Sequence, residues 1–431
     1  MRVAVIGGGV SGLATAFALT RAGLTAEVFE RDAVLGGLAA RCTLEGFSVD
    51  KYYHFVCGGD RRLAALCRDL DLPITWAPTR TSFYYEGHRY PFGSARHLLS
   101  FNALSWSDRY RLSKMMLRCY LMRDGTPLDS VPAEEWLISE LGEHAYRVIW
   151  YPLLSVKFGD RYRDISAAWV WHRIHRLLTS RKHPMARELL GYIHGGAGEV
   201  IGRLSERVRE AGGVVSTGAP VRRLSPRPEG RIQVETDTGE SEYEAVVCSI
   251  PGPEVCRLLD GACSAQLRQV EYIGVVCLLM VLARPVSDSF WVNTNDSRIA
   301  FNGFIELSNL NPRVAGDRHL VYVPYYCAVS SPRFSMPDEA VLNEYLEALR
   351  LIEPKLSMAD VIQWRVFRDT YAQPVTPVRF GERVPSFTGP WPNLFVLESS
   401  QLYPADRNLS GMIELADRVS DLVLASVGGG A

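Results

Sequence analysis

The first 37 residues constrain the fold more than any other stretch of this chain. A short run at 3–6 has the β-branched composition of a buried strand, and it leads into Gly7, Gly9 and Gly12 in the spacing G-x-G-x-x-G. Residues 13–22 are rich in Ala and Leu and form a helix pattern that a glycine ends. This order of strand, glycines and helix predicts a βαβ unit that binds a dinucleotide.

Each glycine has its own physical role in such a unit. Gly7 permits the tight turn, Gly9 lets a pyrophosphate approach the backbone, and Gly12 lets the helix pack closely against the strand. The helix N-terminus, near Ser11, offers free N–H groups and a partial positive charge to the phosphates. We therefore predict that these four residues belong to the dinucleotide site.

A second strand pattern follows the helix and ends on Glu30, eighteen residues after Gly12. A carboxylate at this place can accept hydrogen bonds from ribose hydroxyls. Arg31 comes next, and a further glycine pair, Gly36-Gly37, precedes Leu38. A nicotinamide site has no general need for a second glycine pair here, which favours a different dinucleotide.

This stretch resembles the double-glycine extension of the flavoprotein superfamily that contains amine oxidases, protoporphyrinogen oxidase, phytoene desaturases and UDP-galactopyranose mutase. The resemblance implies FAD, with Arg31, Gly36, Gly37 and Leu38 in the loop around its pyrophosphate and ribityl chain. A second segment, Ala219 to Leu224, resembles the superfamily's strand whose Val, here Val221, bonds the adenine.

The last segment, 400–414, resembles the superfamily's C-terminal flavin segment. There a Gly at a helix N-terminus meets the ribityl chain and the O2 edge of the ring, and Gly411 and Met412 match it. The positive end of that helix favours the negative charge of a reduced flavin.

Two residues are predicted to be catalytic. Asp50 and His54 match the spacing of an acid and a His near the flavin's reactive face in the resembled family; the alternative is a core His under an aromatic cluster. Arg161, in the segment Phe158 to Arg161, is the nearest match to an Arg that faces substrate and flavin in the mutase. The alternative for Arg161 is a surface ion pair with Asp160 or Asp164.

The length of 431 residues favours two domains over one core. The resemblance implies an α/β fold with a discontinuous, Rossmann-like FAD-binding domain and a second, α+β substrate domain. We assign the FAD-binding domain to 1–72, 190–265 and 388–431. The substrate domain then comprises 73–189 and 266–387.

Composition limits the partners. With 47% hydrophobic and 22% charged residues and a net charge of −1, the chain is typical of a globular protein with no nucleic-acid partner. Cations gather at Arg161–Arg187, including Arg173, Arg176, Arg181, Lys182, His183 and Arg187. They form either a solvated face or a contact for an anionic group of a small-molecule substrate. His172 and His175 alone are too few ligands for zinc, so we expect no metal.

Ser107 to Arg123 alternates cations with Leu and Met, as in a basic amphipathic helix. Such a helix either covers a core or makes peripheral contact with anionic lipid. Helices are also expected at 95–99, 133–142 and 144–151, with Ser107 or Asp108 capping the 106–121 helix. Leu63, Leu66, Cys67 and Leu70 give residues 60–70 an amphipathic helix pattern. Hairpins are expected at 40–50, with Gly46 in the turn, and at 83–92, where two aromatic strands flank Glu86-Gly87.

The nine cysteines include no Cys-x-x-Cys pair, which predicts buried, reduced thiols and a cytoplasmic protein, with the inner membrane face as an alternative. The longest apolar stretch, 273–283, is too short to span a bilayer as a helix.

These features predict an FAD-dependent oxidoreductase that passes a hydride from a C–N, C–O or C–C bond to flavin N5. The substrate is small or linked to a lipid or nucleotide. The alternative is a redox-neutral nucleotide-sugar mutase. We favour net oxidation, because the mutase's paired arginines are matched only at Arg161.

Overall fold

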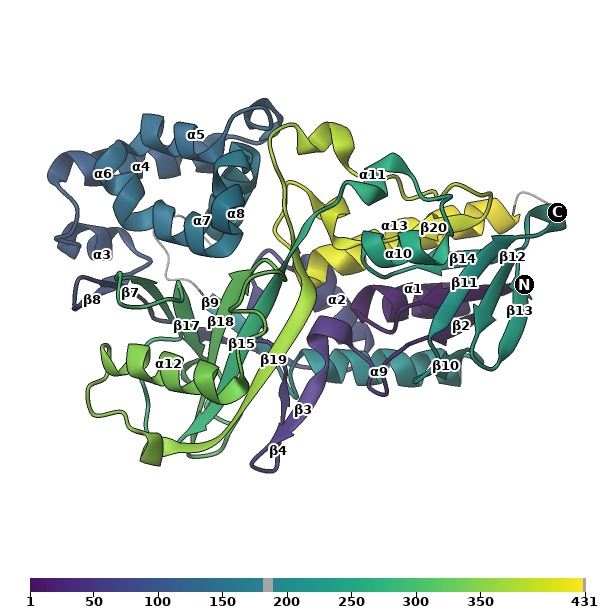
Figure 1. Cartoon of the computed structure of the whole chain (residues 1–431), viewed down its shortest axis with the longest axis horizontal. Coiled ribbons are helices and arrows are strands. Elements are labelled where there is room, and N and C mark those ends of the chain that lie inside the picture. The colour runs from purple at the N-terminus through teal and green to yellow at the C-terminus, as the bar shows by residue number, and fades with distance from the viewer. Residues whose placement is uncertain (181–188, 429–431) are drawn as a thin grey trace.

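The computed structural model describes residues 1–180 and 189–428, and two parts of the molecule are distinct in Figure 1. The part on the right carries the N-terminus and the last helix, α13 (Leu409–Gly428), around a parallel sheet. The part on the left holds a second sheet with a group of helices above it in this view. The chain passes between the two parts several times, as an α/β fold with a discontinuous flavin-binding domain requires.

Five parallel strands form the first sheet, in the order β10-β2-β1-β14-β20. Strands from distant parts of the chain are neighbours: Ala4 pairs with Val246, and Val246 pairs with Leu394. All three regions assigned to the FAD-binding domain contribute, although the exact limits of the five segments stay a prediction. The strands are β1 (Arg2–Ile6), β2 (Thr25–Phe29), β10 (Val214–Ser216), β14 (Ala245–Cys248) and β20 (Leu394–Val396).

Side chains alternate across this sheet and bury both faces. Val3 and Val5 point into a core with the helices α1 (Val10–Arg21), α9 (Ala197–Glu210) and α13. Ala4 and Ile6 point to the opposite face, which packs against a three-stranded antiparallel sheet. Its strands are β11 (Val221–Pro226), β12 (Ile232–Thr236) and β13 (Gly239–Tyr243).

The second large sheet has seven strands in the order β19-β15-β18-β17-β16-β7-β8. The predicted aromatic hairpin is its far edge, with the turn at Glu86 and Gly87, both at positive φ. Neither β16 nor the 14-residue strand β19 was predicted from the sequence. The strands are β7 (Thr81–Tyr85), β8 (His88–Phe92), β15 (Tyr272–Leu282), β16 (Trp291–Asn295), β17 (Gly303–Glu306), β18 (His319–Cys327) and β19 (Val361–Pro374).

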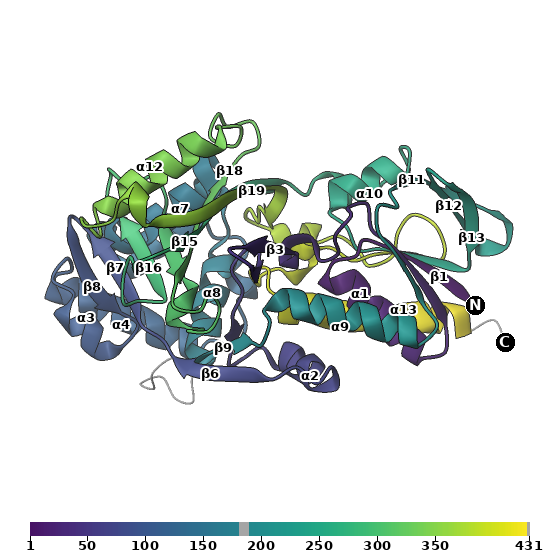
Figure 2. The same cartoon turned by 90° about the horizontal axis from the view of Figure 1, so that it is seen from below.

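β15 is buried along nearly its whole length because both of its faces meet a core. Val276 and Leu278 face the helix α12 (Asp338–Arg350), which covers one side of the sheet (Figure 2). Cys277 and Leu279 face the opposite core, which includes the predicted hairpin β3 (Arg41–Leu44) and β4 (Phe47–Asp50). This second core therefore contains residues from both parts of the molecule.

Helices between residues 95 and 179 pack around a core of their own. The helix at 106–121 has the predicted bounds, but Ser105 caps it, and not Ser107 or Asp108. Ser105 and Asp108 form a reciprocal capping box, which fixes the helix start one turn earlier than Asp108. The helices are α3 (Ala95–Ser100), α4 (Trp106–Leu121), α5 (Ala133–Leu141), α6 (Glu143–Ala145), α7 (Tyr151–Phe158) and α8 (Ala167–Thr179).

The helix expected at 144–151 is replaced by α6, a π-helical turn at Tyr146–Trp150, and the start of α7. Pro152 has no N–H to donate to the carbonyl of Val148, which instead accepts a hydrogen bond of 2.7 Å from Asn295 Nδ2. The missing backbone bond explains why a regular helix does not run through this point.

Three short strands connect the two parts: β5 (Val56–Cys57), β6 (Ile74–Pro78) and β9 (Leu189–Ile193). The helix α2 (Arg61–Asp69) lies between β5 and β6 in the chain and buries Leu63 and Leu66, as its pattern predicts. No helix within the described residues is long and apolar enough to cross a membrane.

The prediction that all cysteines are reduced is wrong at one pair. Cys256 and Cys263 form a disulfide at the short helix α10 (Gly252–Leu258), with their Cα atoms 4.9 Å apart. Their spacing, with six residues between them, is not a recognised pair motif, so the sequence did not reveal it. Cys248, Cys277 and Cys327 are buried and free, as expected.

Candidate functional site

One cavity of about 1560 Å³ lies where the two parts of the molecule meet. Ligand pockets usually have volumes of about 300–1,000 Å³, so this cavity can hold more than one small molecule. Its wall begins at the glycine-rich turn after β1 and continues to the helices α4, α7 and α8.

The glycine-rich turn forms one end of this cavity. Gly7 adopts φ +107°, which only glycine does readily, and its N–H donates to the Phe29 carbonyl at 2.8 Å. A Cβ at Gly9 would have no protein atom nearer than the carbonyl oxygen of Gly36, at 4.0 Å. The space beside Gly9 is therefore free for a ligand, as a close approach by pyrophosphate requires.

Gly12 has a different role, because it does not line the cavity. A Cβ there would collide with the carbonyl oxygen of Gly7 and the hydroxyl of Ser249. Gly12 thus lets α1 start close to the turn, which is the packing role predicted for it. Ser11, one residue earlier, does line the cavity and is buried.

Glu30 is 8% exposed and lines the cavity at the end of β2. Its Oε2 accepts the Gly8 N–H at 2.7 Å, and its Oε1 accepts the Asp32 N–H at 2.9 Å. The carboxylate therefore ties the glycine-rich turn to the segment after β2. Each oxygen retains a second lone pair for a ribose hydroxyl.

The other predicted loop residues surround the same end. Gly36 adopts φ +118°, and its N–H donates to the Gly8 carbonyl at 2.9 Å. A hydrogen bond therefore joins the two glycine segments. Arg31 has a side chain that is 62% exposed and lies 3.6 Å from Glu254. The structure brings Arg31, Gly36, Gly37, Leu38 and Val221 together on the cavity wall.

The start of α13 closes the opposite side. Met412 lines the cavity, whereas Gly411 lies behind it. The Gly411 N–H donates to Asn408 Oδ1 at 2.8 Å, and a Cβ at Gly411 would meet Leu402 at 2.7 Å. Glycine is therefore needed there for helix packing, and of the two predicted residues only Met412 lines the cavity.

His54 lines the cavity, but its predicted acidic neighbour does not. Both oxygens of Asp50 accept N–H groups at the start of α9, from Ala197 and Gly198, each at 2.9 Å. Asp50 is thus a helix cap, and His54 Nδ1 lies 3.5 Å from its Oδ2. Nδ1 makes no hydrogen bond within the described residues, so Asp50 lies near the imidazole without fixing its orientation.

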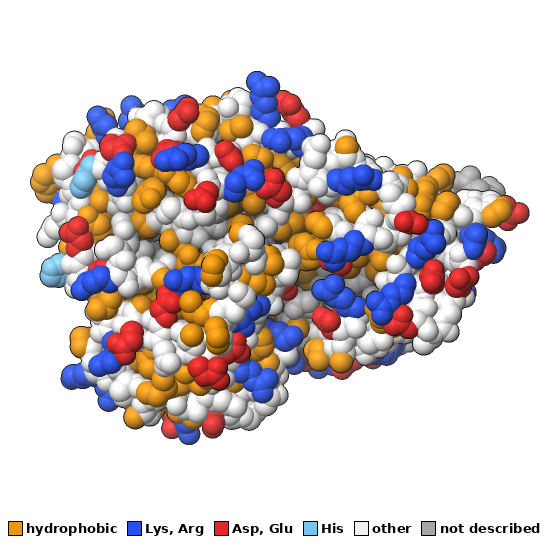
Figure 3. Space-filling view, in the orientation of Figure 1, with side chains coloured by type: hydrophobic (Ala, Val, Ile, Leu, Met, Phe, Trp, Pro, Cys, Tyr) orange, Lys and Arg blue, Asp and Glu red, His pale blue; other side chains and the backbone are white. Residues whose placement is uncertain are grey.

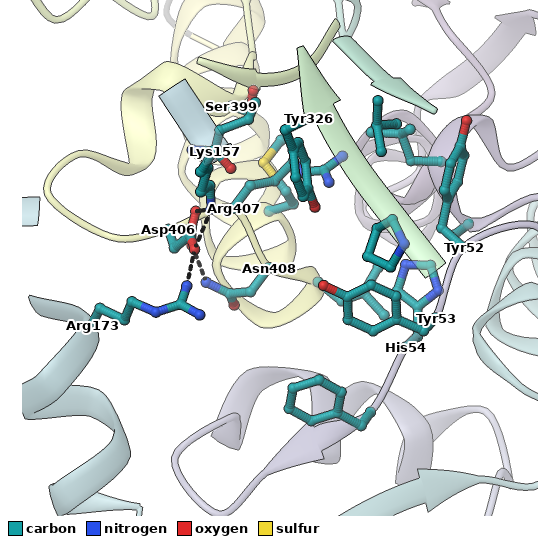
Figure 4. Close-up of a pocket in the computed structure, with 18 of the residues that line it drawn as sticks. Tyr52, Tyr53, His54, Lys157, Arg173, Tyr326, Ser399, Asp406, Arg407 and Asn408 are labelled. Atoms are coloured by element: carbon teal, nitrogen blue, oxygen red, sulfur yellow. Dashed lines mark hydrogen bonds and ion pairs between the residues drawn. The ribbon is translucent and has the colours of Figure 1, made fainter. Parts of the chain in front are cut away.

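Tyrosines form the wall next to His54. Figure 4 shows Tyr52, Tyr53 and Tyr326 around this part of the cavity. Burial raises the pKa of Tyr53 well above its usual value and also raises the pKa of Tyr326. Both side chains therefore remain neutral near pH 7 and offer apolar faces with hydroxyl tips.

A buried charge cluster lies opposite these tyrosines, and sequence analysis found only one of its members. Lys157 Nζ of α7 lies 3.1 Å from Asp406 Oδ2, and Arg173 Nη1 of α8 lies 2.8 Å from the same oxygen. Figure 4 shows this convergence, with Arg407 beside it. Burial alone would raise the pKa of Asp406, but the charges of Lys157 and Arg173 lower it to about 2.

Arg161 lies outside this cavity. Its Nε donates to Asp164 at 2.7 Å and its Nη1 pairs with Glu271, on an exposed surface. Arg161 therefore forms the surface ion pair with Asp164 and not the predicted contact with substrate and flavin. The segment after α7 turns away from the cavity through a 3-10 turn at Gly159–Asp164, which the resemblance did not anticipate.

The other predicted cations divide into three groups. Arg176 is paired with Asp60 at 2.6 Å and joins α8 to the start of α2. Burial lowers the pKa of His172 to about 4, so it is neutral. Arg181, Lys182, His183 and Arg187 lie outside the described residues.

The cavity becomes apolar between the helices. Met115 and Met116 of α4, Leu153 of α7 and Ile174 and Leu178 of α8 line this region, which we call the apolar arm. Nothing in the sequence singles these residues out from the ordinary core positions of amphipathic helices. Only the packing of the helices shows that one side of each borders a cavity.

These observations fit a dinucleotide at the glycine-rich end. The free space at Gly9, the carboxylate of Glu30 and Val221 of β11 all lie on the wall of this cavity, as binding of a pyrophosphate, a ribose and an adenine would require. The pyrophosphate would lie near the N-terminus of α1, where the helix supplies unpaired N–H groups. The remaining volume lies toward the tyrosines and the apolar arm.

Comparison with known proteins agrees with this geometry. A family model described as flavin containing amine oxidoreductase matches residues 10–401. A 15-cis-phytoene desaturase from Synechococcus elongatus is 24% identical over 321 residues, 67% of this chain and 67% of that protein. A carotenoid phi-ring synthase from Streptomyces griseus is 24% identical over 335 residues, 72% of this chain and 63% of that protein.

A solved structure has the same fold. A triple mutant of putrescine oxidase superposes with a TM-score of 0.76 at 17% identity, and the match covers 98% of each chain. The family match covers most of the chain, including the glycine pair at 36–37 and the segments that carry Val221 and His54. The chain therefore belongs to the flavin-containing amine oxidoreductase family, and it is an FAD-dependent oxidoreductase.

Proposed function

We propose that this enzyme oxidises a substrate with a large apolar part. The observation that carries the proposal is the continuity of one cavity of about 1560 Å³ from the glycine-rich turn to the apolar arm. Relatives named for phytoene and for carotenoids support an elongated apolar substrate. Bound FAD supplies the acceptor for a hydride from a C–C, C–N or C–O bond.

The protein's own residues would position the reacting carbon. Tyr53 and Tyr326 present flat apolar walls, and His54 stands beside them with its Nδ1 3.5 Å from Asp50 Oδ2. His54 would orient the substrate or accept its proton as the hydride leaves.

A redox-neutral mutase has little residue-level support. Its predicted contact, Arg161, is bound to Asp164 and Glu271 on the surface. A phosphate-clamping residue must hold the migrating group in position, and Arg161 has no access to the cavity. Net oxidation is therefore the reaction we propose.

The test is anaerobic mixing of oxidised holoenzyme with phytoene in detergent and, separately, with putrescine. We expect phytoene, as a probe with an apolar body but no anionic group, to bleach the flavin absorbance and to yield a product lighter by two hydrogens, more slowly than an apolar compound that also carries an anionic end. Bleaching by putrescine alone would contradict an apolar substrate. An isomeric product that forms only after dithionite reduction would contradict net oxidation.

We also propose that α4 contacts an anionic membrane surface. Trp106 and Tyr110 are each 71% exposed and Leu121 is 65% exposed, while Arg111 and Lys114 are also exposed. Aromatic and basic side chains together favour the interface of anionic bilayers. The same helix lines the apolar arm with Met115 and Met116, so a lipid-dissolved substrate would have a short path.

Flotation with vesicles of phosphatidylcholine and 30% phosphatidylglycerol tests this contact. We expect the wild type to float at low salt, and Trp106→Ser with Leu121→Ser to float much less. Met358→Ser is the control, because Met358 is 47% exposed on another element. Absence of the wild type from the vesicle fraction would contradict membrane contact.

A further inference from the structure

The cluster of Lys157, Arg173, Asp406 and Arg407 carries more positive charge than its own carboxylate can neutralise. Lys157 and Arg173 share one partner, Asp406. The side chain of Arg407 has no ion pair or hydrogen bond among residues 1–180 and 189–428. Lys157 and Arg173 contact the one carboxylate, and Arg407 follows Asp406 in the chain and lines the same cavity, so these four residues carry about two uncompensated positive charges.

Burial makes this surplus costly. Lys157 is 6% exposed, and its Nζ lies 4.9 Å from the ring of Trp169 and 5.4 Å from the ring of Tyr326. Aromatic faces attract a cation but do not neutralise it. An ammonium group in such surroundings costs free energy unless an anion reaches it.

The surplus does not belong to the end of the cavity that fits the pyrophosphate. Lys157 and Arg173 come from α7 and α8, and Arg407 from the segment before α13. The glycine-rich turn contributes none of these side chains. The same two helices line the apolar arm with Leu153 and Ile174, so cations and apolar surface lie next to each other.

We propose that Lys157, Arg173 and Arg407 bind an anionic head group of the substrate, a carboxylate or a phosphate. This assignment rests on the proposed function and narrows it: the substrate is an amphiphile with an apolar body in the apolar arm and an anionic end at this cluster. Arg407 and Lys157 supply the unmatched charge, and Asp406 holds Lys157 and Arg173 side by side. The aromatic walls of Tyr53 and Tyr326 face the same space (Figure 4).

The experiment uses oxidised holoenzyme and three ligands with the same chain: decanoate, decyl phosphate and decanol. Binding is followed by calorimetry and by perturbation of the flavin absorbance. We expect the wild type to bind decanoate or decyl phosphate at least tenfold more tightly than decanol. The tighter of the two anions shows whether a carboxylate or a phosphate is preferred.

The decisive variant is Arg407→Met, which removes a charge without breaking an ion pair. We expect the anion's Kd to rise at least tenfold and the Kd of decanol to stay the same. Lys157→Met should act in the same direction, although it also unpairs Asp406. Arg163→Met is the matched control, because the Arg163 side chain is 73% exposed at the surface.

Other outcomes would overturn the anionic site. Equal affinity for decanol and the anions in the wild type, or an unchanged anion Kd in Arg407→Met, would do so. A shift in the flavin midpoint potential of Arg407→Met without a change in anion Kd would show that the cations serve the cofactor. Failure of the proposed function is distinguishable, because it would appear as absence of FAD or of decanol binding in the wild type.

Discussion

At Gly9 the backbone leaves a space that no side chain of the protein fills. We expect Gly9→Val to abolish FAD binding, because the branched side chain would occupy the place of the pyrophosphate. The ratio of flavin to protein absorbance measures this, with circular dichroism to confirm folding. Gly202→Ala is the control, since a Cβ there meets nothing within 4 Å on the surface of α9. A yellow, folded Gly9→Val protein would contradict the assignment.

Glu30 has two roles. The sequence predicted the contact with ribose but not the hydrogen bonds to the backbone. Because its oxygens accept the N–H groups of Gly8 and Asp32, Glu30→Gln would leave one buried donor without an acceptor. We expect this change to destabilise even the FAD-free protein by about 1–3 kcal/mol. Urea unfolding of the apo form measures it. An unchanged apo protein with weakened FAD binding would limit Glu30 to a ribose contact.

The anionic site has a pH dependence of defined sign. Burial lowers the pKa of Lys157 to about 8. As pH rises through this value Lys157 loses its charge, so we expect decanoate affinity to fall between pH 7 and 9. His172 is already neutral there, and Asp406, whose pKa is lowered to about 2, stays charged. Calorimetry at each pH should show the fall in the wild type but not in Lys157→Met; a flat wild-type profile would contradict it.

Among the elements, α9 depends on a residue far away in the chain. Asp50 caps its N-terminus with two hydrogen bonds across 147 and 148 residues. We expect Asp50→Ala to reduce stability by about 1–2 kcal/mol. Thermal unfolding of the apo protein provides the measurement, and Asp50→Asn, which keeps one acceptor, should lose less. Equal stability of Asp50→Ala and the wild type would remove this role.

Local patterns predicted the elements that local physics determines. The βαβ unit at the N-terminus, the hairpin around Gly87 and the bounds of α4 follow from turn residues and apolar periodicity. β19 was missed because it is an edge strand, where charged residues such as Arg365 and Asp369 interrupt the apolar pattern.

The candidate site also has one part that the sequence could predict and one part that it could not. Its glycine-rich end could be predicted, because each glycine there is required by the sterics of the backbone within one short stretch of sequence. Lys157 and Arg407 could not, since they come together only through contacts between α7 and the segment before α13. Arg161 was misplaced for the same reason: a motif gives the residue type but not the direction of a 3-10 turn.

For the whole molecule, the cavity links stability to the cofactor. Its wall takes residues from both sheets and from the helices between residues 106 and 179, so we expect bound FAD to contact both parts of the molecule. We expect FAD at about 100 times its Kd to stabilise the folded chain by about 2.7 kcal/mol. Differential scanning fluorimetry with and without added FAD measures the shift, and AMP alone should give a smaller one. An unchanged melting temperature would contradict this coupling.

The order of strands in the parallel sheet also determines how long the early strands lack their partners during synthesis of the chain. β1 and β2 leave the ribosome first, yet β14 follows more than 200 residues later and β20 nearly 400 residues later. At about 5–20 residues per second, the first βαβ unit waits roughly 20 to 80 s for its last neighbour. Until β14 is made, one edge of β1 is unpaired, and from then until β20 is made one edge of β14 is unpaired. The unfinished sheet thus presents an unpaired strand edge for most of its translation, a condition that favours aggregation of the new chain.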